Sequence, residues 1–143
     1  HYKSHRKKIR KPNIVKPLKE YMYNNYDSIS IPACEGDDAC GIFATQSLNK
    51  DAVVILSGDK DLRTIPGIHH FIHDESTEIV DEKSADYNWM YQTLTGDMTD
   101  GFGGCPGVGG VKASRILANK KDLPEMWDAV VAEYKRQELR YCR

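Results

Sequence analysis

An apolar run at residues 52–56 is the feature that most constrains the fold of this chain. The run is rich in valine and isoleucine and stops at Ser57 and Gly58, which is typical of a buried parallel strand that feeds a functional loop. A helical pattern with acids in its first turn occupies residues 35–48, shortly before the run. Residues 28–31 precede that helix and alternate as a strand does. Strand, helix and strand in this order predict an α/β unit.

The other local patterns extend this expectation along the chain. The expected elements are a helix that ends near residue 26, a hairpin over residues 67–80 and helices over residues 84–94, 111–119 and 124–139. The sequence has no run of about 18 apolar residues, so it indicates neither a membrane-spanning helix nor a signal peptide. The four cysteines form no CxxC pair, which argues against a zinc site and a disulfide framework. We expect reduced thiols and a cytoplasmic protein.

Positive charge is concentrated at the start of the chain, although the net charge of the 143 residues is only −1. Residues 1–19 hold eight Lys and Arg side chains and no acid, whereas all 21 acids lie beyond them. This asymmetry indicates contact with a polyanion such as a nucleic acid. A solvated basic tail would show the same composition, so the charge run alone leaves both interpretations open.

Carboxylates occur in three clusters along the chain. Two of the clusters follow expected strands, and the third lies beside a glycine-rich segment. Their members are Glu35, Asp37 and Asp38; Asp59 and Asp61; and Asp97 and Asp100. Any one cluster could merely cap a helix or occupy a solvated turn. In open α/β sheets, however, ligands bind at the carboxyl ends of strands, so these clusters are candidates for one shared site.

The chemistry of such a shared site follows from its ligand type. Carboxylates that converge repel one another unless cations lie among them. Hard cations prefer oxygen ligands, so Mg²⁺ or Mn²⁺ fits the set better than zinc. Two ions about 3.5–4 Å apart can stabilise both the attacking and the leaving oxygen of a phosphoryl transfer. The clusters therefore predict two-metal hydrolysis of a phosphodiester.

Glycines are concentrated just before an expected helix. Residues 101–110 contain six glycines, and the segment from Gly107 and Gly109 to Lys112 and Ala113 has the form GxGxxxA. A tight turn there directs backbone N–H groups and the positive end of a helix at a phosphate, with Lys112 as a nearby cation. The GKS or GKT of a P-loop is absent from it. We interpret the segment as a helix-hairpin-helix that grips a duplex backbone, with a purely structural glycine turn as the alternative.

Four segments in a fixed order carry a family resemblance. They are Tyr2-Lys3-Ser4-His5-Arg6, Glu35-Gly36-Asp37-Asp38-Ala39, Ser57-Gly58-Asp59-Lys60-Asp61-Leu62, and Thr95-Gly96-Asp97-Met98-Thr99-Asp100-Gly101 through Lys112-Ala113. In this order the chain resembles the flap-endonuclease superfamily, above all the short phage-type 5′-to-3′ exonucleases, over about residues 2–119. Those enzymes are related to the 5′-nuclease domain of bacterial DNA polymerase I. The resemblance implies an α/β fold with a parallel-sheet nuclease core of the PIN-like or resolvase-like kind.

The resemblance also implies roles for individual residues. The implied metal ligands, for two Mg²⁺ or Mn²⁺ ions, are Glu35, Asp37, Asp38, Asp59, Asp61, Asp97 and Asp100. Lys3 and Arg6 match catalytic positions that draw the scissile phosphate inward. The implied DNA contacts are Lys3, Arg6, Lys7, Lys8, Gly107, Val108, Gly109 and Lys112. Carbonyl groups of Gly107, Val108 and Gly109 could in addition hold a K⁺ ion.

The chain departs from the family pattern at two points. Family members place further aspartates ahead of the Tyr-Lys motif, whereas this chain begins at His1. We therefore expect it to be a piece of a longer protein, with one metal site incomplete and apolar sheet edges exposed. His5 also replaces the asparagine of the family's Tyr-Lys-x-Asn-Arg pattern.

These observations predict a metal-dependent 5′-to-3′ exonuclease or flap endonuclease that acts on DNA with a 5′ end or flap. We expect it to serve phage DNA replication in the host cytoplasm, with no membrane partner, and RNA in a hybrid stays open. The expected domains are a basic arch or clamp segment with its helix at residues 1–27, an α/β core at 28–95 and a helix-hairpin-helix region at 96–143. One alternative is a non-catalytic helix-hairpin-helix DNA-binding module. A toprim-like phosphotransfer domain is another, but it has no use for the glycine hairpin.

Overall fold

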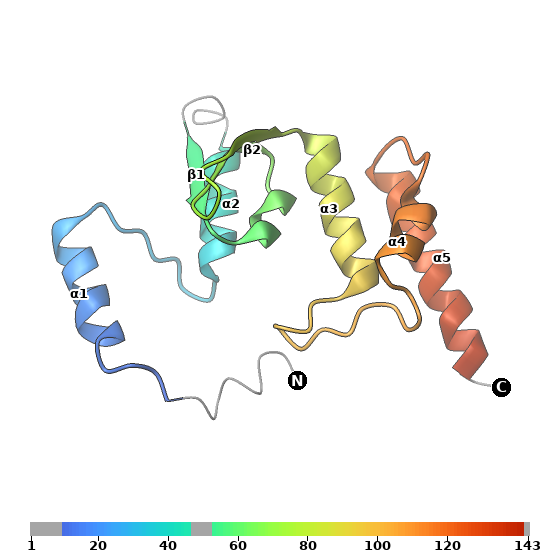
Figure 1. Cartoon of the computed structure of the whole chain (residues 1–143), viewed down its shortest axis with the longest axis horizontal. Helices are drawn as coiled ribbons and strands as arrows, with labels where there is room; N and C mark the ends of the chain where they lie inside the picture. The colour runs from blue at the N-terminus through green and yellow to red at the C-terminus, as the bar shows by residue number, and fades with distance from the viewer. Residues whose placement is uncertain (1–9, 47–52, 142–143) are drawn as a thin grey trace.

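A computed structural model describes residues 10–46 and 53–141 of the chain. Its elements, in chain order, are α1 (Val15–Asn25), α2 (Gly36–Thr45), β1 (Val54–Ser57), the 3₁₀ helix η2 (Lys60–Thr64), β2 (Gly67–Phe71), β3 (Thr77–Val80), α3 (Glu82–Thr95), α4 (Gly110–Leu117) and α5 (Leu123–Tyr141). Figure 1 shows the sheet and α2 on one side of α3, with α4 and α5 on the other. The expected α/β class is confirmed.

The sheet has three strands in the order β1-β2-β3. β1 pairs in parallel with β2, and β2 pairs antiparallel with β3, so the sheet is mixed and contains one parallel pair. The expected hairpin over residues 67–80 is therefore present as β2 and β3. The side chains of Ile55, Phe71 and Val80 lie on one face of the sheet and are buried.

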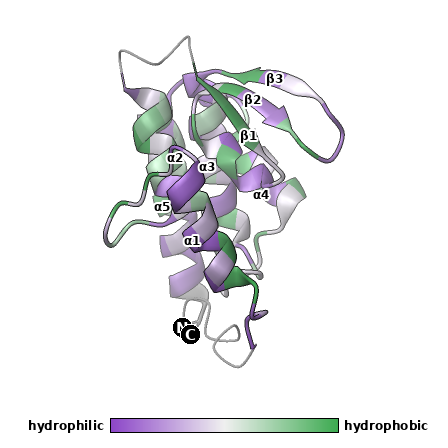
Figure 2. Cartoon of the chain, turned by 90° about the vertical axis from the view of Figure 1, so that its left-hand side faces the viewer, coloured by the Kyte–Doolittle hydropathy of each residue, from purple (hydrophilic) through white to green (hydrophobic). Residues whose placement is uncertain are grey.

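The opposite face of the sheet is open to solvent. Val54 is 53% exposed and Leu56 is 65% exposed on β1, and Ile79 is 80% exposed on β3. These side chains share one face because Val54 pairs with Ile68, which in turn pairs with Ile79. Figure 2 shows hydrophobic colouring along β1 and β3. The sheet thus contributes one packed face and one uncovered apolar face.

Residues 28–31, expected to form a strand, are irregular, so that expectation is wrong. Alternation alone does not form a strand, because each strand needs a hydrogen-bonded neighbour, and none pairs with this segment in the described part of the chain. Pro32 and Ala33 then form a turn, with Ala33 at a φ of 63°. The helix expected over residues 35–48 is α2, which is shorter and ends at Thr45.

Two separate clusters of buried side chains form the interior. The smaller cluster lies under the sheet and consists of Ala44, Ile55, Leu62 and Ile65. The larger cluster lies among α3, α4 and α5, and consists of Met90, Leu94, Cys105, Val108, Ala113, Leu117, Met126 and Val130. Helix α3 contacts η2 on one side and both C-terminal helices on the other. It therefore joins the two clusters.

Helix α1 stands apart from both clusters (Figure 1). It buries none of its side chains, and Tyr21, Tyr23 and the neighbouring Tyr26 are all exposed. Within residues 10–46 and 53–141, none of the helices combines the length and apolar character that crossing a bilayer requires.

Candidate metal centre

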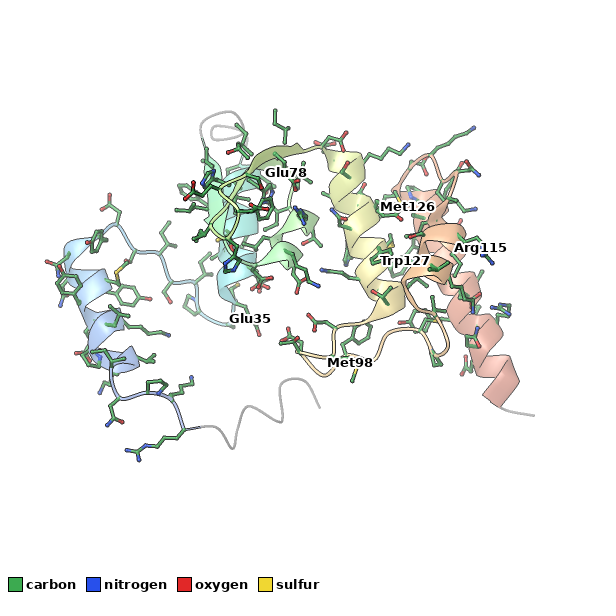
Figure 3. The ribbon with its side chains drawn as sticks, viewed as in Figure 1. Glu35, Glu78, Met98, Arg115, Met126 and Trp127 are labelled. Atoms are coloured by element: carbon green, nitrogen blue, oxygen red, sulfur yellow. The ribbon has the colours of Figure 1, made fainter. Side chains whose placement is uncertain are left out.

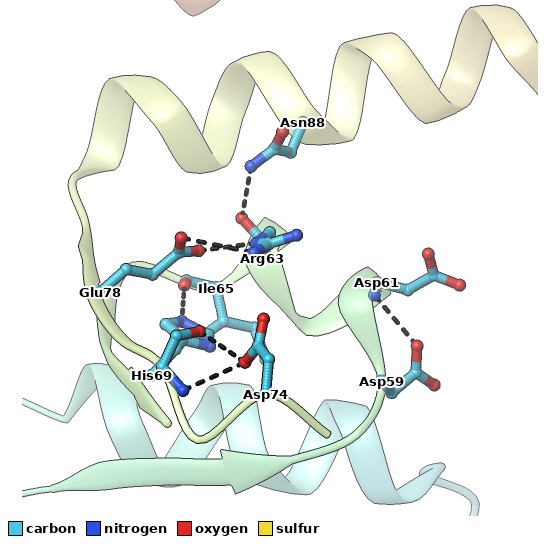
Figure 4. Close-up of polar contacts among 9 residues, drawn as sticks. Asp59, Asp61, Arg63, Ile65, His69, Asp74, Glu78 and Asn88 are labelled. Carbon is cyan, nitrogen blue, oxygen red and sulfur yellow. Dashed lines mark hydrogen bonds and ion pairs between the residues drawn. The ribbon is translucent and has the colours of Figure 1, made fainter. Parts of the chain in front are cut away.

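The first acidic segment of the site follows β1 directly. The Asp59 N–H donates to Ser57 Oγ at 2.9 Å, and Asp59 then caps η2 by accepting the Asp61 N–H at 3.0 Å (Figure 4). A Cβ on Gly58 would lie 2.6 Å from Nε2 of the exposed His73 side chain, so a larger residue there would require that ring to move. The close turn and the cap place Asp59 and Asp61 at the carboxyl end of the strand, where ligands of α/β sheets bind.

The second acidic segment forms the start of α2. Glu35 is its N-cap, and the Asp38 carboxylate accepts the Glu35 N–H at 2.9 Å as part of a capping box. Asp37 lies between them in the first turn. The capping box explains why three acids are compatible with this helix end, since the helix dipole favours negative charge there. Because Asp38 is engaged in the cap, its role as a metal ligand stays a prediction.

The third acidic segment is the loop after α3. Asp97 and Phe102 pair as an isolated antiparallel bridge, and the Asp97 carboxylate accepts the Thr99 N–H at 2.6 Å. Gly96 and Gly104 pack backbone against backbone beside this bridge: a Cβ on Gly96 would lie 2.5 Å from the Gly104 nitrogen. The two glycines therefore close the loop, and this closure fixes the position of Asp97.

The three segments meet at one cleft of about 760 Å³. Its acidic lining residues are Glu35, Asp37, Asp59, Asp61, Asp97 and Asp100. Lys60 and Cys40 also line it, whereas Asp38 does not. Figure 3 shows Glu35 at the N-terminal end of α2 and Met98 in the loop after α3, on the same side of the molecule. The cleft therefore gathers six of the seven carboxylates that the sequence analysis singled out.

The pKa values of two acids in the cleft are shifted in opposite directions. Partial burial raises the pKa of Asp61, and a hydrogen bond with Asp97 and the negative charges of Asp59 and Asp97 raise it further. The backbone N–H of Thr99 is the main reason why the pKa of Asp97 lies below its ordinary value. Of the two carboxyl groups, Asp61 is therefore the more easily protonated. A bound cation would relieve the repulsion between these acids.

Sequence analysis missed one residue of the site, Gln92 of α3. Its side-chain Nε2 donates to Asp61 Oδ1 at 2.7 Å, which fixes the orientation of that carboxyl group. One turn earlier on the same helix, Asn88 donates to the Arg63 carbonyl at 3.0 Å (Figure 4). Asn88 and Gln92 are four residues apart, and side chains at that spacing share one face of a helix. This spacing is the sequence signal that could have indicated a polar face on α3.

The donor set of the cleft fits a hard divalent cation. All the acidic lining groups offer carboxylate oxygens, the ligands that Mg²⁺ and Mn²⁺ prefer. Over the ranges that the structure describes, no group of three His, Cys, Asp or Glu side chains has the spacing of a bound metal ion's ligands. Carboxylates that repel one another are expected to stand apart until a cation draws them in.

The glycine hairpin lies beside the larger core cluster. The Val108 side chain is buried in that cluster, so Val108 can offer a ligand only its backbone. Gly107 has a φ of +69°, a conformation that favours glycine, and α4 begins at Gly110. Lys112 Nζ lies 2.8 Å from Glu133 Oε1 and donates to the Gly107 carbonyl at 3.3 Å. A K⁺ ion at that carbonyl would therefore share its oxygen with an ammonium group.

The basic residues Lys3, Arg6, Lys7 and Lys8 lie outside the described residues. Their expected contacts with DNA stay predictions.

Comparison with curated proteins finds phage nucleases. The chain is 35% identical over 114 residues to an exodeoxyribonuclease of Enterobacteria phage T3 and 34% identical over 114 residues to an exonuclease of Escherichia phage T7. Each match covers 76% of this chain, but the chain spans only 37% and 38% of the length of those relatives. A 5′-3′ exonuclease of Mycoplasmopsis pulmonis is 25% identical over 97% of this chain and 53% of its own length. No protein-family model matches the chain.

Comparison with solved structures identifies the fold. A bacteriophage T5 flap endonuclease, solved as a pseudo-enzyme–product complex with DNA and metal ions, matches with a TM-score of 0.68 and 15% identity. That match covers 98% of this chain and 64% of the T5 chain. A T5 protein co-crystallised with metal ions matches with a TM-score of 0.67, also at 15% identity, over 98% of this chain and 65% of its own.

Proposed function

We propose that this chain is part of a phage-type 5′-to-3′ exonuclease of the flap-endonuclease family and that it hydrolyses DNA phosphodiesters with divalent metal ions; its similarity to the phage T3 and T7 exonucleases supports the proposal. One observation carries the proposal: three segments far apart in the sequence bring six carboxylates to a single cleft. Individual acids of the cleft cap helices or hold a loop, but those roles do not require the acids to converge, and clustered acids repel one another. Their convergence suits metal-assisted phosphodiester chemistry.

Glu35, Asp37, Asp59, Asp61, Asp97 and Asp100 are the residues of this chain that would hold the ions. When bound, two such ions neutralise the charge that develops on the phosphate and favour attack by water. The residues of the chain orient these ligands: Asp59 caps η2, Gln92 holds Asp61, and the Asp97–Phe102 bridge holds the loop. Both Mg²⁺ and Mn²⁺ suit this ligand set.

The substrate proposal rests on charge and on the hairpin. We assign the basic residues Lys3, Arg6, Lys7 and Lys8 to a 5′ strand or flap, because they add positive charge without a balancing acid. The hairpin at Gly107, Val108 and Gly109 would hold the backbone of the adjoining duplex with its N–H groups. The T5 flap endonuclease of similar fold was solved with DNA, which supports a DNA substrate.

We further propose three functional regions with the bounds derived from the sequence: a basic arch or clamp segment at 1–27, the metal-binding core at 28–95 and the helix-hairpin-helix region at 96–143. Two observations support this division. Helix α1 buries none of its side chains, and the two buried clusters lie on opposite sides of α3.

The test is cleavage of a 5′-flap DNA labelled at its 3′ end, in Mg²⁺ or Mn²⁺, by the 143-residue chain. Asp59→Ala should abolish cleavage and leave DNA binding largely intact, because Asp59 serves the ions and not the DNA backbone. Equal cleavage by this variant would overturn the metal assignment.

A second candidate function is a DNA-binding module without catalysis. It is favoured by one observation: Asp38, one of the seven expected ligands, is held in the capping box of α2 and does not line the cleft. If the wild-type chain binds the flap DNA but does not cut it at any metal concentration tested, this second function is the correct one for the chain.

A further inference from the structure

Glu133 is a buried acid that the proposed nuclease site does not use. It lies on α5 with 7% of its surface exposed, whereas most glutamates of soluble proteins face water. Its carboxylate accepts from Arg136 Nε at 2.8 Å, from Gln137 Nε2 at 2.6 Å and from Lys112 Nζ at 2.8 Å. These donors hold the pKa of Glu133 at about 2, so the buried side chain is charged.

Of these three partners, Lys112 links Glu133 to a different element. Arg136 and Gln137 lie on the same helix as Glu133, within four residues of it, whereas Lys112 lies on α4. The Lys112 ammonium also donates to the Gly107 carbonyl at 3.3 Å. A chain of contacts therefore runs from α5 through Lys112 to Gly107, in the hairpin loop that we define as residues 105–109.

We propose that Glu133 and Lys112 are positioning residues that hold the hairpin loop in its DNA-binding conformation, and that Lys112 does not itself bind a phosphate. This inference rests on the proposed DNA-binding role of the hairpin. A Lys112 ammonium that moved to a phosphate would give up its contact with a buried carboxylate and leave Arg136 alone to balance the charge of Glu133, which disfavours the move. The loop then contacts DNA through its backbone, and Lys112 keeps the loop in place.

The first test needs no DNA. Glu133→Gln keeps the size of the side chain but removes the charge that holds Lys112. Amide hydrogen exchange of Cys105 and of residues 107–110 should become about fivefold faster or more in this variant, because the loop loses the contact that holds it. Glu138→Gln is the matched control: Glu138 is exposed on the same helix, and its loss should leave the exchange of these amides unchanged. Unchanged exchange in Glu133→Gln would overturn the proposal.

The second test uses a short DNA duplex and separates positioning from simple electrostatics. Glu133→Gln removes a negative charge, so electrostatics alone predicts tighter DNA binding. The positioning role predicts the opposite, a loss of about tenfold in affinity, with Glu138→Gln at or slightly above the wild-type affinity. Equal or tighter binding by a folded Glu133→Gln variant would contradict the proposal.

Lys112→Met keeps the proposal testable should the buried Glu133 variant not fold, because the Lys112 side chain is one-third exposed. Lys112→Met should weaken DNA binding by the same factor at every salt concentration. The slope of log affinity against log salt concentration should therefore stay unchanged. A slope smaller by about 0.9, the amount expected for one lost phosphate contact, would overturn the positioning role. If the wild-type chain binds no DNA, the proposed function fails, and the hydrogen-exchange comparison still decides whether Glu133 and Lys112 hold the loop.

Discussion

Asp61 illustrates how a single carboxyl group depends on a residue outside the acidic motifs. Its Oδ1 accepts from Gln92 Nε2, and its carboxyl group also hydrogen-bonds Asp97. Both interactions restrict the rotation of the Asp61 side chain. Since a metal ligand must be oriented as well as present, we expect Gln92 to affect cation binding without contacting the cation.

Gln92→Leu should therefore reduce the stabilisation that Mn²⁺ gives to the protein. The expected reduction in Mn²⁺ affinity is about tenfold. This is the lower end of the effect on metal affinity that residues hydrogen-bonded to metal ligands typically have. The measurement is the rise in thermal midpoint on adding Mn²⁺, since a ligand that binds the native state raises its stability.

Asn88→Leu is the control for this variant. Asn88 lies one turn earlier on α3 and holds η2 through the Arg63 carbonyl, not through a carboxylate. Its loss should lower the midpoint of the metal-free protein and leave the Mn²⁺-induced rise unchanged. Equal Mn²⁺-induced rises in wild type and Gln92→Leu would rule out the positioning role of Gln92.

At the scale of elements, the loop after α3 is held by backbone packing. The Cys105 N–H donates to the Leu94 carbonyl at 2.8 Å, and the Asp97 N–H donates to the Phe102 carbonyl at 2.7 Å. Gly104 has a φ of +64°, and a Cβ there would lie 2.7 Å from the Leu94 oxygen. Because these neighbours are backbone atoms that cannot turn aside, the position accepts glycine alone.

Gly104→Ala should destabilise the chain by on the order of 2 kcal/mol or more, because it combines backbone strain with a backbone clash. For a chain of this size, that corresponds to a fall in thermal midpoint of roughly 4–8 °C. Gly103→Ala is the matched control, since a Cβ at Gly103 meets nothing within 4 Å. Thermal unfolding followed by circular dichroism measures both, and equal midpoints for the two variants would refute this view of the loop.

At the scale of the whole molecule, no segment of the described part of the chain covers one face of the sheet. Val54 and Leu56 of β1 and Ile79 of β3 are all more than half exposed, and Ile68 of the intervening β2 pairs with both Val54 and Ile79. Contiguous apolar surface of this kind promotes association in water. The sequence analysis expected apolar sheet edges to be exposed, and in the described residues the exposed surface is a sheet face.

The double variant of Val54→Thr and Ile79→Thr should lessen self-association of the chain. Threonine keeps the β-branched shape that strands favour, and its hydroxyl replaces a methyl group of Val54 and the ethyl group of Ile79. Sedimentation velocity over a range of concentrations should show less association than in wild type. Ile29→Thr is the control, because Ile29 is 61% exposed but lies away from the sheet, in an irregular segment. Equal association in all three proteins would contradict this inference.

The sequence predicted those parts of the fold that depend on local signals. Residues 52–56 carried a clear strand pattern and residues 67–80 a weaker, hairpin-like one, and the structure contains β1 at Val54–Ser57 and β2 and β3 within residues 67–80. Residues 28–31 alternated equally well but are irregular, because a strand also requires a partner that local sequence does not reveal.

The candidate site shows the same division between local and distant information. The acidic residues could be selected from the sequence because each cluster is contiguous or nearly so. The contact of Gln92 with Asp61 could not be predicted in this way, since it joins residues that are 31 positions apart in the sequence. Lys112 was expected to bind DNA, but its contact with Glu133 depends on the packing of α4 against α5, which sequence patterns do not specify.

The central claim is that three distant segments form one site for divalent cations, and calorimetric titration with Mn²⁺ tests it most directly. One variant from each segment, Asp37→Asn, Asp59→Asn and Asp97→Asn, is compared with wild type and with Asp128→Asn, whose side chain is exposed on α5. Each of the three should lower the Mn²⁺ affinity by about tenfold or more, and Asp128→Asn should not. Identical isotherms for wild type and all three variants would contradict the claim.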